Sequence, residues 1–421
     1  MSEEIIQICK SVKEAANCVA NLDSATKNKI LLEVANNIKA NSKKIIKANN
    51  IDIKFAKENN LSAAKLDRLL LDEHRLAALA GSVASIAKLK DPVGKIIYHA
   101  KVKSNGLDIR RITVPIGVIL AIYEARPNVT SDIAALALKS GNAVILRSGK
   151  ESFNSSKAIA EIYSNALKKF KIDSNAVHYV NSIDRSWVNS FLKMDNYIDV
   201  VIPRGGKDLV KSITKNSRIP IFKHLDGNCH SYVESHADFD KARKIVINAK
   251  MRRVGICGAC ESLLIDQKIA AKFLPLIVSD LKKLGCEVRG DAESRKIANS
   301  FNETLKIATD RDFYTEYLDK IISIKIVKNI DEAITHINKY SSLHTEAIIT
   351  ENQKQAEKFF KLINSAIVMH NASTQFADGG EFGFGAEVGI STGKLHARGP
   401  VGLEQLVTYK YLVESDFAVR K

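Results

Sequence analysis

The sequence predicts an α/β protein made of two α/β domains with mostly parallel sheets, and two observations support this prediction. The chain has 421 residues, of which 45% are hydrophobic, and this is enough for more than one buried core. From residue 114 onward, short runs rich in valine and isoleucine alternate with helical stretches. Such alternation is typical of βαβ units, in which consecutive strands run parallel and helices cover the sheet.

The region before this alternation predicts helices and a hairpin. Residues 4–90 carry apolar side chains at helical spacing, and Asp23 or Ser24 is expected to cap one of the helices. We expect a β-hairpin over 99–114, because it contains the Asn-Gly pair 105–106, which favours the tight turn between antiparallel strands.

The alternating region is followed by a tail of a different kind. The alternating segments are 114–123, 131–142, 143–147, 152–170, 197–202, 243–250, 261–265, 272–284 and 320–327. The later stretch 371–404 is dense in glycine and has little periodicity, and a long irregular stretch in a compact protein is usually functional. We expect a last strand over 405–413.

The composition disfavours membrane and nucleic-acid-binding classes. The opening residues are acidic and polar, unlike a signal peptide, and the longest apolar run, 114–123, is far too short to cross a bilayer. We therefore expect a soluble cytoplasmic protein. The net charge of +16 would suit a nucleic acid or an anionic ligand, but no basic run dominates and no aromatic residues are interleaved with the lysines. We favour a solvated lysine-rich surface, with anionic substrates as a further local reason for the charge.

The pair Cys257 and Cys260 has several open interpretations. A structural zinc site would need a second Cys-x-x-Cys or a suitably spaced histidine pair, and the sequence has neither. A redox dithiol would need a strand-to-helix turn, which the surrounding GICGAC does not form, so both interpretations are disfavoured. Gly255 and Gly258 give the backbone freedom, so N–H groups near Cys257 could form an oxyanion hole around a nucleophile. Cys260 is placed like an apolar packing residue, and a buried inert thiol is the alternative for either cysteine.

Three predicted strands end in residues that could hold a ligand, because parallel sheets bind ligands beyond the carboxyl ends of their strands. After 197–202, Gly205 and Gly206 allow the close approach of backbone N–H groups. Arg204 and Lys207 beside them favour an anion such as a pyrophosphate. A plain tight turn is the alternative.

The second strand end carries Arg147 and Lys150, before a helix that we expect to be capped near Ser152. Basic side chains there could meet an adenosine ribose or its 2′-phosphate, with a surface loop as the alternative.

The third strand end carries Glu124, Arg126 and Asn128, which lie between an apolar strand and an apolar helix. The alternative is a capped turn, with Thr130 or Ser131 as the cap.

Several segments of the chain resemble the gamma-glutamyl phosphate reductase family, also called the glutamate-5-semialdehyde dehydrogenases, of the aldehyde dehydrogenase superfamily. These segments are 117–147, 201–210, 224–233, 315–327, 331–352 and 371–411. They run across nearly the whole chain in the family's order. The resemblance implies an aldehyde dehydrogenase-like α/β fold with a Rossmann-like cofactor domain, a catalytic domain and a β oligomerisation flap.

The resemblance also implies where these parts lie. The NADP-binding domain would cover 1–228, with 373–400 returning to it, and the catalytic domain would cover 229–372. The hairpin 99–114 and the segment 401–421 would form the flap, which implies a homo-oligomer, a dimer or larger.

The implied reaction is the NADPH-dependent reduction of L-glutamate 5-phosphate to L-glutamate 5-semialdehyde and phosphate through a cysteine thioester. This is the second step of proline biosynthesis from glutamate. The implied cofactor is NADPH or NADP, with no metal. Transient contact with glutamate 5-kinase is a candidate interaction, whereas neither a nucleic acid nor a membrane is expected as a partner.

The family's Cys-Asn-Ala-x-Glu motif matches CGACE here, with the nucleophile at Cys257, Gly258 in place of the usual asparagine and Cys260 at the x position. Asn128 is implied as a side-chain partner of the Cys257 N–H in the oxyanion hole. His224 stands where hydrolytic members of the superfamily carry a glutamate base. The absence of this glutamate base fits reduction rather than aldehyde oxidation, because reduction of an acyl phosphate needs no activated water.

The resemblance assigns the remaining site residues to the cofactor and the substrate. Glu316 would hold the nicotinamide ribose. The residues near the adenosine ribose and the cofactor's phosphates would be Arg147, Lys150, Gly205 and Gly206. The candidate partners of the substrate's α-carboxylate and phosphate are Arg126, Arg204, Lys394 and Arg398.

Two other functions stay open on the sequence. An oxidative NAD(P)-dependent aldehyde dehydrogenase would turn over without phosphate. A nucleic-acid-binding protein would show salt-sensitive affinity that does not depend on Cys257.

Overall fold

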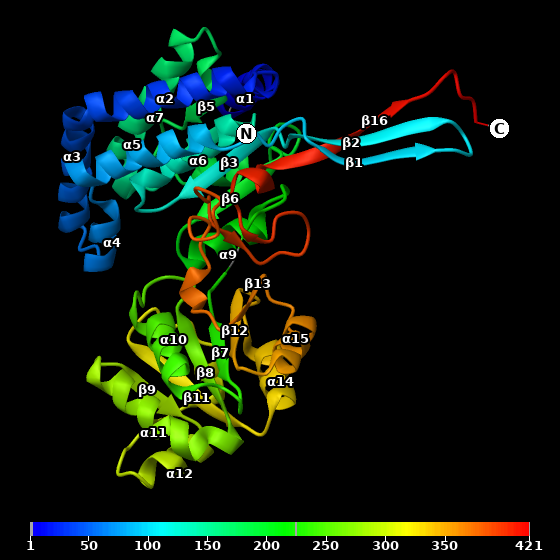
Figure 1. The fold of residues 1–421 in the computed structure, drawn as a ribbon. Helices are drawn as coiled ribbons and strands as arrows, with labels where there is room; N and C mark the ends of the chain where they lie inside the picture. Colours follow the sequence, from blue (N-terminus) through cyan, green and yellow to red (C-terminus); the bar gives the residue numbers. More distant parts are fainter. Residues whose placement is uncertain (1–2, 224, 421) are drawn as a thin grey trace. The chain divides into compact units, whose positions relative to one another are not determined.

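The computed structural model describes residues 3–223 and 225–420, and the chain divides into two compact units (Figure 1). The first unit comprises Met1–Lys223, Gly383–Gly389 and Val401–Lys421, and the second comprises His224–Phe382 and Ile390–Pro400.

The predicted cofactor domain, 1–228 with 373–400, and the predicted catalytic domain, 229–372, stay predictions beside this division. Of the segment 373–400, only Gly383–Gly389 belongs to the first unit. The rest stays with the second unit because Ala377 and Ile390 belong to one of its apolar clusters. The functional labels of the two domains stay predictions.

The N-terminal region of the first unit is helical, as the periodicity predicted. Asp23 caps the second helix, since its side chain accepts a hydrogen bond of 2.7 Å from the Thr26 N–H. The helices are α1 (Glu3–Ala20), α2 (Ser24–Ala40), α3 (Ser42–Glu58), α4 (Ala63–Leu69) and α5 (Glu73–Lys88).

A parallel sheet in the order β5-β4-β3-β6 forms the core of the first unit. Its strands are β3 (Val118–Tyr123), β4 (Ala143–Ser148), β5 (Val177–Tyr179) and β6 (Val200–Arg204). Side chains of α1, α8 (Ser186–Phe191) and α9 (Lys207–Asn216) cover one face, in a cluster with Leu120 and Ile122. The side chain of Tyr123 points to the other face, because side chains alternate along a strand. There its hydroxyl is hydrogen-bonded to Thr130 of α6 (Pro127–Lys139), and α7 (Phe153–Lys169) packs beside α6.

Three boundaries differ from the predictions. Thr130 and Ser131 do not cap α6, because the helix already begins at Pro127, whose fixed φ suits a first helical turn. Both lie buried inside the helix. The strand expected over 197–202 begins only at Val200. The apolar run 114–123 is broken at Gly117, where a φ of +129° lets the chain pass from β2 (Leu107–Pro115) to β3.

The predicted hairpin and last strand are confirmed as one antiparallel sheet in the order β1-β2-β16. It consists of β1 (Ile96–Val102), β2 (Leu107–Pro115) and β16 (Val407–Glu414), and Gly106 at the hairpin tip has a φ of +72°. Figure 1 shows the three strands side by side as an arm. The outer strands leave Ile96, Tyr98, Tyr411 and Val413 exposed.

The second unit is a parallel sheet covered by helices on both faces. Its order is β10-β9-β11-β8-β7-β12-β13. The strands are β7 (Cys229–Val233), β8 (Cys260–Asp266), β9 (Glu287–Gly290), β10 (Lys306–Ile307), β11 (Ile321–Val327), β12 (Thr345–Ile349) and β13 (Ile367–His370). In Figure 1, α14 (Ile330–Tyr340) and α15 (Gln353–Leu362) pack on one side. The other side carries α10 (Phe239–Met251), α11 (Gln267–Lys283) and α12 (Ala292–Asn299).

The glycine-dense tail contains little regular structure. It includes the short antiparallel pair β14 (Ile390–Ser391) and β15 (Gly399–Pro400), together with a 3₁₀ turn, η3 (Thr374–Phe376). Within residues 3–223 and 225–420, no helix combines the length and the apolar character that crossing a membrane requires.

Candidate active site

Cys257 lies in the loop 252–259, between the end of α10 and the start of β8. Its side chain is half-buried and packs beside the apolar cluster that contains Ala377. A hydrogen bond of 3.0 Å from the Ala259 N–H to the Ile256 carbonyl closes a turn around the cysteine. The thiol therefore stands on a tight turn at the amino end of β8.

Gly227 approaches this loop from the segment that leads into β7. A Cβ atom at Gly227 would lie 2.0 Å from the carbonyl oxygen of Cys257, so a side chain does not fit there. The Gly227 N–H donates a hydrogen bond of 2.9 Å to Oε1 of Glu316. The predicted nucleophile and the predicted ribose ligand thus both contact one glycine.

Cys229 and Cys260 are buried neighbours, paired in register across β7 and β8. Cys260 lies fully buried in an apolar cluster of the second unit, as a packing residue would, and burial raises the pKa of its thiol to about 12. Cys229 donates from Sγ to the carbonyl oxygen of Cys257 at 3.1 Å, and burial raises its pKa well above the ordinary value. Neither Cys229 nor Gly227 is marked by a motif of its own, although both lie in the segment 224–233 that carries the resemblance.

The first unit places most of the other predicted residues at the carboxyl ends of neighbouring strands. In the sheet, β3 lies between β4 and β6. The residues at these three ends are Arg126, Asn128, Arg147, Lys150, Arg204, Gly205 and Gly206. This is the edge of a parallel sheet at which a nucleotide is expected to bind.

Glu124 takes one of the backbone donors that were expected to meet a cofactor phosphate. Its Oε2 accepts a hydrogen bond of 3.0 Å from the Gly206 N–H, directly before α9. A Cβ atom at Gly205 would lie 2.7 Å from the same oxygen. The first N–H groups of a helix stabilise carboxylates and phosphates alike. The turn therefore suits an anion, and the Glu124 carboxylate holds that position here.

Arg147 and Lys150 are placed differently from each other. Arg147 is buried, and its guanidinium donates to the carbonyls of Ser148 at 2.9 Å and Ile183 at 3.2 Å. It thereby ties the end of β4 to a neighbouring segment, and burial lowers its pKa. Lys150 is exposed, with its ammonium 4.9 Å from the centroid of the Phe55 ring. An exposed ammonium can bind a phosphate directly.

Asn128 is anchored within α6. Its Nδ2 donates a hydrogen bond of 3.1 Å to Oδ2 of Asp132, one turn further along. Burial raises the pKa of Asp132 to about 6, while the Asn128 bond and the nearby Arg204 lower it. A side-chain amide has two N–H donors, so this bond fixes the direction of Asn128 and leaves one donor for an oxyanion.

Lys394 and Arg398 lie in the second unit, between β14 and β15. Arg398 donates from Nη1 to the side-chain oxygen of Asn364 at 3.0 Å and from Nη2 to the carbonyl oxygen of the same residue. Lys394 is exposed. The prediction for His224 falls on a position outside the described residues.

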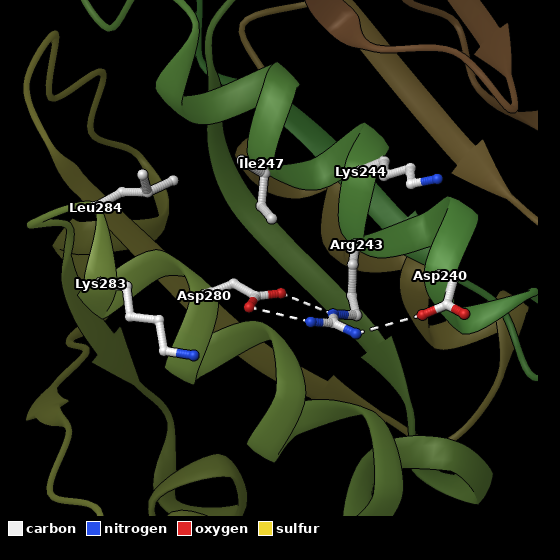
Figure 2. Close-up of a pocket in the computed structure, with 7 residues that line it drawn as sticks. All are labelled: Asp240, Arg243, Lys244, Ile247, Asp280, Lys283 and Leu284. Atoms are coloured by element: carbon white, nitrogen blue, oxygen red, sulfur yellow. Dashed lines mark hydrogen bonds and ion pairs between the residues drawn. The ribbon is translucent and has the colours of Figure 1, made fainter.

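A separate hollow lies between α10 and α11, and Figure 2 shows its lining. Its volume is about 450 Å³. Arg243 spans it and binds Asp280 through Nε at 2.7 Å and Asp240 through Nη1 at 3.3 Å. None of the predicted site residues lines this hollow, and both of its carboxylates pair with Arg243.

Comparisons with known proteins show the family to which the chain belongs. The model of the aldehyde dehydrogenase family matches residues 1–297. The chain is 48% identical over 412 residues to a gamma-glutamyl phosphate reductase of Caldanaerobacter subterraneus subsp. tengcongensis, covering 98% of each chain. It is 50% identical over 408 residues to the enzyme of that name from Paramagnetospirillum magneticum, covering 97% of this chain and 95% of the relative.

A solved structure is similar over its full length. The crystal structure of gamma-glutamyl phosphate reductase from Thermotoga maritima superposes with a TM-score of 0.96 at 45% identity, and the match covers 100% of both chains.

Proposed function

Because the chain belongs to the aldehyde dehydrogenase family, we propose that it is a gamma-glutamyl phosphate reductase that reduces L-glutamate 5-phosphate to L-glutamate 5-semialdehyde and phosphate. This reaction is the second step of proline biosynthesis from glutamate. The observation that carries the proposal is the identity of 48% over 98% of both chains with a relative of that name. The resemblance seen in the sequence is thereby confirmed.

In this reaction Cys257 acts as the nucleophile. Its thiolate attacks the acyl carbon of the substrate, phosphate leaves, and a thioester remains on the sulfur. The thioester carbon accepts a hydride, and the hemithioacetal then releases the aldehyde and the free thiol. The turn at Ile256–Ala259 and the Cys229 contact hold the peptide on either side of Cys257. The backbone N–H of Cys257 and the amide of Asn128 would stabilise the oxyanion.

The residues of the first unit fit a nicotinamide cofactor. The carboxyl ends of β3, β4 and β6 and the anion-binding turn before α9 are features of a dinucleotide site. When bound, NADPH supplies the hydride. Lys150 and the Gly205–Gly206 turn would hold its phosphates, Arg147 would shape the neighbouring segment, and Glu316 would hold the nicotinamide ribose. Gly206 can donate to a phosphate only after Glu124 has moved from its N–H.

The preference for NADPH over NADH is supported by Lys150. A 2′-phosphate adds negative charge at the end of β4, where the Lys150 ammonium is exposed. The substrate brings a phosphate and an α-carboxylate, and its candidate partners are Arg126, Arg204, Lys394 and Arg398.

The arm formed by β1, β2 and β16 would join subunits into a homo-oligomer. Its support is the exposure of apolar side chains on a protruding sheet, among them Ile96 at 59% and Tyr411 at 57%. Contact with glutamate 5-kinase and a cytoplasmic location stay predictions.

The reverse reaction tests the proposed function. Purified protein is mixed with glutamate 5-semialdehyde and NADP, with and without phosphate, and NADPH formation is followed by absorbance. We expect phosphate-dependent NADPH formation that Cys257→Ser abolishes and Cys260→Ser retains. Turnover without phosphate would identify an oxidative aldehyde dehydrogenase instead. Equal loss in both variants would refute the assignment of Cys257 as the sole nucleophile.

A further inference from the structure

A fully buried ion pair joins the two stems of the cysteine loop. Lys250 lies in the last turn of α10, and Glu261 is the second residue of β8. Their side chains are 0% exposed, and Nζ of Lys250 lies 2.5 Å from Oε2 of Glu261. The loop 252–259, which carries Cys257, runs between these two residues. The pair therefore closes the base of the loop.

The same pair holds the segment that carries Glu316. Oε1 of Glu261 accepts a hydrogen bond of 3.3 Å from the backbone N–H of Leu318. The ring centroid of Tyr317 lies 5.8 Å from the ammonium of Lys250. Both contacts fall directly after Glu316 in the chain.

This segment is also fixed on its other side. The hydroxyl of Tyr317 donates to Oδ1 of Asp312 at 2.9 Å, and Asp312 is bound in turn by Nη1 of Arg289 at 2.6 Å. Burial raises the pKa of Glu261 to about 7, and the positive charge of Lys250 opposes this shift. Removal of Lys250 would therefore favour a neutral Glu261.

We propose that Lys250 and Glu261 are positioning residues that set the distance between Cys257 and Glu316, and with it the geometry of hydride transfer. The inference rests on the proposed function. A buried ion pair adds little net stability compared with apolar residues of similar volume, but it fixes direction and spacing. Acylation of Cys257 needs only the thiol and an activated acyl group. Hydride transfer also needs the nicotinamide that Glu316 would hold, so the two steps should respond differently to loss of the pair.

Glu261→Gln and Lys250→Met test the proposal in two assays. The first is the burst of 4-nitrophenolate from 4-nitrophenyl acetate, with the Cys257→Ser signal subtracted, and it reports acylation without cofactor. The second is the phosphate-dependent oxidation of glutamate 5-semialdehyde by NADP, with hydrogen or deuterium at the aldehyde carbon. We expect the burst rate of both variants to stay within about twofold of wild type. Turnover should fall about 100-fold, because a misplacement of reacting groups by about 1 Å lowers the rate by this factor. A primary isotope effect on kcat should then emerge.

Two further variants separate positioning from general destabilisation. Leu318→Gly keeps the backbone N–H that bonds Glu261, at an exposed site with a φ of +53° that glycine accepts, so it should fold and show no isotope effect. Lys27→Met removes a lysine that is 2% exposed and paired with Asp91 in the first unit, and it should lower stability without an isotope effect.

Equal loss of burst and turnover without an isotope effect would reduce the pair to a structural role and overturn the proposal. Unchanged kinetics in Glu261→Gln and Lys250→Met beside an active wild type would also overturn it. An inactive wild type would overturn the proposed function and this inference together.

Discussion

The backbone of Gly227 lies so close to Cys257 that a Cβ atom at position 227 would stand 2.0 Å from the Cys257 carbonyl oxygen. No heavy atom can occupy that position without moving the cysteine loop. The N–H of the same residue donates to Glu316 at 2.9 Å. Any shift of Gly227 therefore displaces the nucleophile and the proposed ribose ligand together.

Gly227→Ala should reduce kcat about 100-fold, because the new methyl group forces the Cys257 loop out of place. Initial velocities of NADPH formation measure this. Gly81→Ala is the matched control, since a Cβ atom there has no neighbour within 4 Å and position 81 lies in α5. It should leave kcat unchanged and slightly raise stability. Equal activity of the two variants would contradict the close approach.

Restoring the family's asparagine at Gly258 should lower activity rather than raise it. A Cβ atom at this position would lie 2.9 Å from the carbonyl oxygen of Thr374, on the η3 turn. Because the Cβ atom causes the clash, Gly258→Ala and Gly258→Asn should lose similar fractions of kcat. A gain in kcat for Gly258→Asn alone would show that the loop adapts to the larger residue.

Alkylation should separate the six cysteines by exposure. Iodoacetamide at pH 7.5 should modify the exposed Cys18 and the half-buried Cys257, and inactivation should follow modification of Cys257. The other four cysteines are buried, and burial raises the pKa of each thiol. The pKa rises to about 12 for Cys9 and Cys260, to about 11 for Cys286, and well above the ordinary value for Cys229.

Mass spectrometry of peptides after increasing labelling times measures the alkylation rate of each cysteine and checks this order of reactivity. Cys18→Ser is the control and should keep both activity and the inactivation rate. Labelling of Cys229 or Cys260 as fast as Cys257 would contradict the burial.

His336 should make the protein sensitive to acid. Burial lowers its pKa to about 2, with smaller effects from His230, Lys325 and Lys339. The unfolded chain binds a proton below the ordinary pKa of about 6.5 while the folded chain does not, so stability is lost as pH falls below that value. Protonation of this one group should lower the free energy of unfolding by about 1.4 kcal/mol for each pH unit below that value.

Urea unfolding followed by circular dichroism at pH 7 and pH 5 measures the effect. His336→Phe keeps a ring beside Phe313, whose centroid lies 4.9 Å away, and should lose less stability between the two pH values than wild type. His74→Gln on the exposed surface of α5 is the control. Identical pH dependence of wild type and His336→Phe would refute the prediction.

Local features of the sequence determined the elements and the family. Strand–helix alternation predicted the parallel sheets, the Asn-Gly pair at 105–106 predicted the hairpin, and Asp23 was one of the two residues predicted to cap the second helix. These features depend on residues a few positions apart, so they can be read along the chain. The resemblance, which the comparisons confirm, then singled out Cys257 over Cys260.

The partners of these residues were decided only by the tertiary structure. Glu124 takes the N–H of Gly206, 82 residues further along the chain, and Arg147 binds the carbonyl of Ile183, 36 residues away. Both contacts require that β3 lie beside β6 and that β4 be covered by the following segments.

The ion pair at the base of the cysteine loop illustrates the same limit. In the sequence, Lys250 and Glu261 are two ordinary charged residues. They become a buried pair only when α10 packs against β8. Strand order and helix docking arise from burial of the whole core rather than from spacing along the chain. For this reason the sequence singled out the proposed nucleophile, Cys257, but not the contacts that hold its loop in place.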